Sequence, residues 1–334
     1  MDWLSSLNLT AGEFINVLTA AYVLCALGLA VHFGFTGLLN FGQAAFAALG
    51  AYGFAIATLN FGWPWWAALL AGIFAAAAFA LILGIPTLRL RADYLAIVTI
   101  AAAQALVFSF QSSAFEKVTG GSNGLSGFGE DFYALNPIPE GQYPFSIWFN
   151  ADIAIPFSNK ELFIRIVAWG LVLVAALFLF FLTRSPWGRV LKGIREDEDA
   201  VRALGKNVFA YKMQALVIGG VLAALGGMVF VLATDTNQPA TWVSNFTFMI
   251  WTVLLLGGAA TILGPIIGGM IFFALLSLTE IVLSAMVQGG LLPFLDVAQV
   301  GQIRYLLVGL ILMLLVIFRP QGIFGNKKEL QFNG

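Results

Sequence analysis

Charged residues, histidine and cysteine are all scarce in this chain of 334 residues. Only 10% of its residues are charged, compared with roughly a quarter in a soluble globular domain. Hydrophobic residues make up 60%, and the mean hydropathy is +0.92. Apolar runs of about 20 residues, the length that a helix needs to cross a bilayer, recur from end to end. The sequence therefore predicts an all-α polytopic membrane protein, because a helix satisfies its own backbone hydrogen bonds in lipid.

The shortage of reactive side chains limits the chemistry that the chain could perform. One histidine, His32, and one cysteine, Cys25, leave no cluster with metal-ligand spacing and no disulfide within the chain. No nucleophile has a base at a suitable spacing, and no glycine-rich phosphate loop is visible. His32 is interpreted as a packing residue at a helix end. We therefore expect no catalytic residue and no metal site, and nothing in the sequence predicts a nucleic-acid partner.

Nine transmembrane helices are predicted within one domain that covers residues 1–334. Their approximate ranges are 14–33, 38–60, 64–85, 93–111, 162–182, 212–233, 245–262, 265–288 and 303–318. Gly264 and Pro265 separate the seventh span from the eighth. This break is either a tight turn or a broken helix lining a cavity, and we favour the turn.

The distribution of basic residues predicts the orientation. Twelve of the sixteen Lys and Arg residues fall in alternate loops: Arg89 with Arg91, the segment 184–212, and Arg319 with Lys327 and Lys328. Cytoplasmic loops carry an excess of Lys and Arg. Nine spans with an external N-terminus and a cytoplasmic C-terminus place all three groups inside. Residues 113–161 then form an external loop, and residues 319–334 form a cytoplasmic tail.

Polar residues inside the predicted spans are few. Those that could line a pathway are Asn40, Gln43, Thr99, Gln104 and Glu280. A hydrogen bond between helices explains each of them at least as well. Glu280 is the only carboxylate clearly within a span, whereas transporters driven by protons or sodium usually need such groups at mid-membrane. A transport function would therefore take its energy from elsewhere.

The charged segment, residues 184–212, contains seven of the sixteen basic residues and four of the acidic ones. Acidic residues 196–199 followed by AVRAL and Gly205 predict a short helix from Asp197 to Leu204, since acids favour a helix start and glycine a helix end. Val201 and Leu204 are expected to share one face, with Ala200 beside them. Such a short helix is marginal alone in water, so it is expected to pack on the bundle or on a cytoplasmic partner. Arg195, Arg202 and Lys206 supply positive charge around it.

Six stretches, which together span nearly the whole chain, resemble a known family. They are GLLNFGQAAFAALGAY (37–52), LRLRADYLAIVTIA (88–101), TGGSNGLSGF (119–128), SPWGRVLKGIREDEDAVRALGKN (185–207), LLLGGAATILGPIIGG (254–269) and FRPQGIFG (318–325). In these stretches the chain resembles the LivM-type permease subunits of ATP-binding-cassette (ABC) importers for branched-chain, or hydrophobic, amino acids.

The resemblance implies a multi-pass subunit of the bacterial cytoplasmic (inner) membrane. It implies a heterodimer with a second related permease, two cytoplasmic ATPase subunits that bind ATP and Mg, and an extracytoplasmic substrate-binding protein. This chain would hold no cofactor itself. The docking pattern of such permeases is Glu-Ala-Ala, three residues, then Gly. Here the match is Asp199-Ala200-Val201, three residues ending at Leu204, then Gly205, so Asp replaces Glu and Val replaces the second Ala.

Three alternatives remain open from the sequence. The same architecture could import urea or short amides, because specificity in such systems rests largely with the binding protein. A stand-alone secondary transporter or channel is less consistent with the scarcity of intramembrane charge. A membrane enzyme would need a cluster of reactive side chains that the sequence does not contain.

Overall fold

The computed structural model describes residues 3–89, 92–146, 154–289, 297–319 and 321–325. The longer helices are α1 (Trp3–Phe14), α2 (Val17–Leu29), α3 (Gln43–Phe61), α4 (Trp65–Thr87), α5 (Ala92–Gln111), α8 (Asn159–Arg184), α9 (Pro186–Glu196), α11 (Val208–Thr234), α12 (Ser244–Gly257), α13 (Leu263–Gln288) and α14 (Val297–Phe318). The short helices are η1 (Ala30–Phe35), η2 (Ser113–Phe115), α6 (Glu116–Thr119), η3 (Gly121–Asn123), α7 (Glu130–Tyr133), α10 (Glu198–Ala203) and η5 (Pro239–Trp242). Arg91, Lys327 and Lys328, which contributed to the predicted orientation, lie outside the described residues.

Seven helical stretches among the described residues are long and apolar enough to cross a membrane. They are residues Ser6–Phe35, Gln43–Phe61, Trp65–Thr87, Tyr94–Gln111, Asn159–Arg184, Val208–Thr234 and Leu263–Gln288. The other two predicted spans correspond to α12, an apolar helix of 14 residues, and to α14. The prediction of an all-helical polytopic membrane protein is confirmed.

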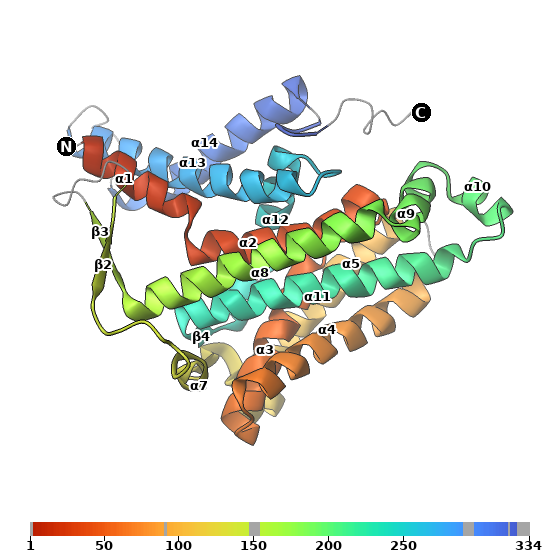
Figure 1. The fold of residues 1–334 in the computed structure, drawn as a ribbon, viewed down its shortest axis with the longest axis horizontal. Coiled ribbons are helices and arrows are strands. Elements are labelled where there is room, and N and C mark those ends of the chain that lie inside the picture. Colours follow the sequence, from red (N-terminus) through yellow and green to blue (C-terminus); the bar gives the residue numbers. More distant parts are fainter. Residues whose placement is uncertain (1–2, 90–91, 147–153, 290–296, 320, 326–334) are drawn as a thin grey trace.

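The structure adds a helix, α1, that the sequence analysis did not predict. It packs along α13, and the chain then turns sharply into α2 (Figure 1). Asn16 holds this turn, because its side-chain oxygen accepts a hydrogen bond from Leu18 N at 3.1 Å and its amide donates to Glu13 Oε2 at 2.8 Å. The Glu13 carbonyl also accepts from Thr19 Oγ1 at 2.7 Å.

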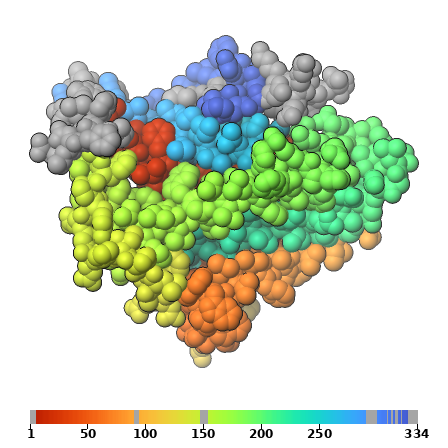
Figure 2. Space-filling model, viewed as in Figure 1, coloured from red at the N-terminus to blue at the C-terminus, as the bar shows by residue number. Residues whose placement is uncertain are grey.

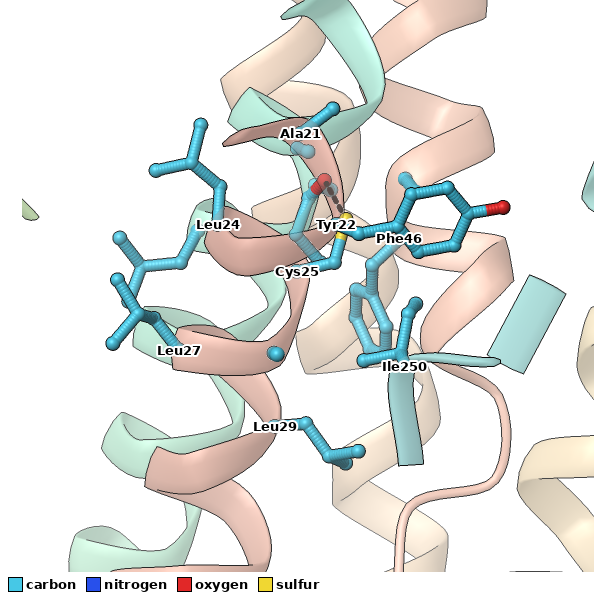
Figure 3. Packing of buried hydrophobic residues seen from close by; sticks show 14 of the residues in the cluster. Ala21, Tyr22, Leu24, Cys25, Leu27, Leu29, Phe46 and Ile250 are labelled. Carbon is cyan, nitrogen blue, oxygen red and sulfur yellow. Dashed lines mark hydrogen bonds between the residues drawn. The ribbon is translucent and has the colours of Figure 1, made fainter. Parts of the chain in front are cut away.

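Helix α2 is the centre of the bundle, in contact with α8, α11, α12 and α13. Apart from Leu18, every residue of α2 is buried. Figure 3 shows why, with Leu24 and Leu27 on one side of α2, and Phe46 and Ile250 packed on the other. An apolar helix covered on all sides is typical of the interior of a large helical protein.

Helices α12 and α13 form an antiparallel hairpin. Residues 258–262 join them, and Gly264 and Pro265 fall in the first turn of α13. Gly257 packs directly on Gly264, so neither position has room for a side chain. The interpretation of this break as a turn is confirmed, although the turn precedes Gly264 instead of including it.

Two short antiparallel strand pairs lie at the end of the bundle opposite α9 and α10 (Figure 1). Strand β1 (Leu125–Ser126) pairs with β4 (Thr236–Asn237), and β2 (Gln142–Phe145) pairs with β3 (Ile155–Ser158). Tyr133 fastens this region to α11, because its hydroxyl donates to Leu232 O at 2.8 Å. Burial, with Asp235 and Glu161 adding negative charge nearby, raises the pKa of Tyr133 to about 12. The predicted external loop is thus an ordered cap in the part that the structure describes.

Candidate functional site

The charged segment folds into two helices, α9 and α10, at one end of the bundle (Figures 1 and 2). Helix α9 begins with Pro186 after the N-cap Ser185, a combination that favours a helix start. Gly188, Leu191 and Ile194, spaced three residues apart, are buried. The sequence analysis missed α9, although Ser185-Pro186 and this apolar spacing were visible signals of it.

Helix α10 lies where the sequence predicts a helix but is one residue shorter at each end, because Asp197 is its N-cap and Leu204 its C-cap. The Asp197 carboxylate accepts hydrogen bonds from the backbone N–H groups of Asp199 and Ala200, both at 3.0 Å. Gly205 follows with φ +75°, a left-handed conformation that glycine adopts without strain. The helix is therefore specified locally at both ends.

Ion pairs fasten α10 to the bundle. Glu198 pairs with Arg202 of its own helix at 2.9 Å and with Lys212 near the start of α11. The Arg195 side chain is only 9% exposed, and its Nη1 donates to Gly34 O at 2.6 Å, at the end of η1. A joint displacement of α9 and α10 would therefore act on η1 through Arg195 and on α11 through Glu198.

The outer side of α10 remains open. Its exposed residues, which we call the α10 surface, are Asp199, Ala200, Arg202, Ala203 and Leu204. Leu204 is 78% exposed, so most of this apolar side chain is open to contact with another molecule. Val201 instead is buried and faces Gly193 of α9. The expectation that Val201 and Leu204 share one face is wrong, because the helix has already ended at Leu204.

The six predicted coupling residues thus divide into two groups. Arg195 and Val201 point inward and hold the two helices to the bundle. Asp199, Ala200 and Leu204 are exposed, and Gly205 ends the helix. One cavity, of about 270 Å³, lies between this unit and the bundle, and Ile194, Arg195, Glu198 and Lys212 line it.

Three of the predicted pathway residues lie in a buried polar cluster where η1 passes into α3. Asn40 and Gln43 are fully buried, and Thr99 is 1% exposed. Asn40 Nδ2 donates to Gln43 Oε1 at 2.9 Å and to His32 Nδ1 at 3.0 Å, while Gln43 Nε2 donates to Cys25 O at 3.0 Å. Thr99 Oγ1 accepts from Phe41 N at 3.0 Å.

His32 completes this buried cluster. Its Nε2 lies 3.1 Å from Leu216 O, a group that can only accept, so Nε2 carries the proton and Nδ1 accepts from Asn40. The ring therefore joins η1, α11 and the segment before α3. The expected role of His32 in helix-end packing agrees with this position.

The other two predicted pathway residues lie elsewhere. Gln104 is half-buried on α5. Glu280 is on α13, where it forms an ion pair with Arg304 of α14. The sequence analysis did not single out Arg304, although it is the only charged residue of α14. Among the residues that the structure describes, no three His, Cys, Asp or Glu side chains are grouped as metal ligands would be.

Comparisons with known proteins agree with this architecture. The family described as "Branched-chain amino acid transport system / permease component" matches residues 13–317. The high-affinity branched-chain amino-acid permease LivM of Escherichia coli is 31% identical over 92% of this chain and 69% of its own length. A probable LivM of Methanocaldococcus jannaschii is 25% identical over 92% of this chain and 91% of its own.

The guanosine permease NupQ of Bacillus subtilis is 25% identical over 85% of this chain and 84% of its own. No solved structure matches the chain. The helical bundle and the match over nearly the whole chain lead to one conclusion. This chain belongs to the family of permease components of branched-chain amino-acid transport systems.

Proposed function

We propose that this chain is one membrane-spanning subunit of an ATP-driven importer for branched-chain or other hydrophobic amino acids. The amino-acid class is taken from the LivM relatives, of which the first is similar over most of both chains. The complete transporter would contain a second related permease, two cytoplasmic ATPase subunits that bind ATP and Mg, and an extracytoplasmic binding protein. ATP hydrolysis would take place in the ATPase subunits and not in this chain.

The α10 surface is the observation that carries this proposal. It presents an exposed leucine beside two charged residues at one end of an otherwise apolar bundle. Binding interfaces typically combine a buried anchor with a polar, solvent-accessible rim. The surface therefore suits insertion into a groove of an ATPase subunit. Arg195 and Glu198 would then pass its movement to η1 and α11, which pack on α2 at the centre.

The proposal includes nine spans, with the N-terminus outside and the C-terminus in the cytoplasm. In this orientation α9 and α10 face the cytoplasm, and strands β2 and β3 face outward. Of the five predicted pathway residues, we propose that Glu280 lies on the pathway. Asn40, Gln43 and Thr99 would hold the break before α3, because their polar atoms bond to one another and to the backbone.

A matched pair of leucine substitutions tests the docking role. Leu204→Asp places a carboxylate on the α10 surface, whereas Leu135→Asp makes the same change at a 49% exposed leucine in the loop at the opposite end. We expect Leu204→Asp to weaken ATPase binding at least about fivefold, since loss of an anchor residue at the centre of an interface costs more than about 1 kcal/mol. The measurement is co-purification of the ATPase subunits, with ATP-dependent leucine uptake by the reconstituted complex.

Leu135→Asp should bind the ATPase and transport leucine normally. If Leu204→Asp also retains both properties, α10 is not the coupling helix. Competition of labelled leucine uptake by unlabelled urea or guanosine distinguishes an amino-acid carrier from one for the other cargos.

A further inference from the structure

The outer surface of α12, α13 and α14 differs from the rest of the bundle. In their central turns, α4 and α8 expose apolar side chains such as Phe74, Leu173 and Val174, which suits contact with lipid. The α12–α14 surface also exposes apolar side chains, such as Phe248 and Leu306, but adds Asn245, Tyr305 and the Glu280–Arg304 ion pair to them. Charged side chains at the lipid surface are costly, so such a surface normally faces water or protein.

A groove of about 430 Å³ lies on this surface. Residues 245, 248, 249 and 252 of α12 line it at helical spacing, so one stripe of α12 forms its wall. Phe272 of α13 and Tyr305 of α14 close the other side. This volume falls in the range of about 300–1,000 Å³ that is usual for small-molecule sites.

The groove combines apolar and polar groups in separate places. The side chains of Phe248, Met249 and Phe272 supply apolar surface, and Phe248 is 52% exposed. Asn245, Thr252 and the Tyr305 hydroxyl supply polar atoms. An apolar wall with a few polar groups is typical of a site for a small amphipathic molecule.

The ion pair lies beside Tyr305. Arg304 Nη2 is 3.3 Å from the Tyr305 hydroxyl, and its guanidinium carbon lies 4.9 Å from the centre of the Tyr305 ring. The Glu280 side chain is 50% exposed. Arg304 Nε is buried and has no hydrogen-bond partner among the described residues, so one donor of this arginine is unsatisfied. A carboxylate can accept from two guanidinium nitrogens at once.

We propose that this groove binds the transported amino acid and that the α12–α14 surface lines the translocation pathway. This inference rests on the proposed import function. The apolar side chain of the substrate packs against Phe248, Met249 and Phe272. Its carboxylate binds Arg304, and its ammonium group binds Glu280. A zwitterionic amino acid suits this site. Its two charged groups replace the Glu280–Arg304 ion pair with two new ion pairs and leave the net charge of the site unchanged.

Cysteine substitutions test the groove directly. The native Cys25 is fully buried and provides a low background for thiol labelling. Phe248→Cys places a thiol in the groove, and Phe74→Cys places one at a 74% exposed phenylalanine on α4 as a matched control. The complete transporter, in membranes, is treated with a charged methanethiosulfonate that cannot enter lipid. Leucine, with the binding protein present, serves as the protecting ligand.

We expect Phe248→Cys to react at least about tenfold faster than Phe74→Cys, because the reactive thiolate forms in water and not in lipid. Leucine should slow the reaction at position 248 alone. Equal, slow labelling at both positions would mean that lipid or the second permease fills the groove. Fast labelling without protection by leucine would exclude the amino acid as its occupant.

The groove assignment and the import function are tested by separate measurements. Labelling at position 248 is compared with labelling at position 74 without any need for transport. ATP-dependent leucine uptake by the unsubstituted complex is measured independently. If that uptake is absent, the proposed function fails; if uptake is present but labelling shows no contrast, only the groove assignment fails.

Discussion

At the scale of single residues, Asn40 is a buried polar residue whose side chain and carbonyl are all hydrogen-bonded. Its amide nitrogen donates to His32 and Gln43, and its Oδ1 accepts from Gly42 N at 2.8 Å. The Asn40 carbonyl also accepts from Trp251 Nε1 at 3.1 Å. The stretch from Thr36 to Gly42 has no regular secondary structure, so these bonds replace the helical hydrogen bonds that lipid would otherwise require.

Asn40→Ala should therefore destabilise the protein. It leaves His32 Nδ1, Gln43 Oε1 and the Gly42 N–H unpaired, and each buried polar group without a partner costs about 1–3 kcal/mol. Asn60→Ala is the matched control, since Asn60 is exposed on α3 and its amide donates a long hydrogen bond of 3.4 Å to Val118 O. Thermal unfolding in detergent should show a lower midpoint for Asn40→Ala alone. Equal midpoints for the two variants would contradict a structural role for the cluster.

At the scale of helices, α2 and α11 pack through glycines. A Cβ atom at Gly219 would overlap His32 Nε2 and lie 2.5 Å from Gly28 O. Close backbone approach through small residues is a common way for helices to associate in membranes, where no hydrophobic force drives them together. The same contact holds the His32 ring against Leu216 O, so helix packing and the polar cluster depend on each other.

Gly219→Ala should push α2 and α11 apart. It should lower the free energy of unfolding by about 1–3 kcal/mol, as overpacking of a close-packed core usually does. Gly170→Ala makes the same change on α8, where nothing lies within 4 Å of the added Cβ. Gly170→Ala should leave the free energy of unfolding unchanged or raise it by up to about 1 kcal/mol, because alanine favours a helix more than glycine does. Fluorescence-detected thermal stability of both variants measures the difference. A neutral Gly219→Ala would mean that the two helices do not approach this closely.

The sequence predicted the helices better than their contacts. Apolar length indicates a span from local information alone, and the caps Asp197 and Gly205 specify α10 in the same way. His32 and Leu216 are 184 residues apart, and no local pattern could pair them. The Glu280–Arg304 ion pair could not be predicted from a local pattern either, because the two residues lie on different helices. Helix α9 was missed because its charges were assigned to a loop.

At the scale of the whole molecule, the two ends of the bundle have opposite characters. One end carries α9, α10 and their ion-paired charges, and the other carries the strands and the loop around Tyr133 (Figure 1). The positive-inside rule predicts that the α9–α10 end faces the cytoplasm, because this end contains most of the described basic residues. The docking proposal requires the same orientation, since ATP is supplied from the cytoplasm.

Cysteine labelling in intact cells measures this orientation. Asp199→Cys puts a thiol on the α10 surface, where the native side chain is 89% exposed, and Glu140→Cys puts one at an exposed position of the opposite loop. Both substitutions remove one carboxylate, so the two variants are matched in charge. An impermeant maleimide should label Glu140→Cys in intact cells and Asp199→Cys only after the membrane is opened. The reverse pattern would place α10 outside, where no ATPase could reach it, and would refute the importer mechanism together with the positive-inside assignment.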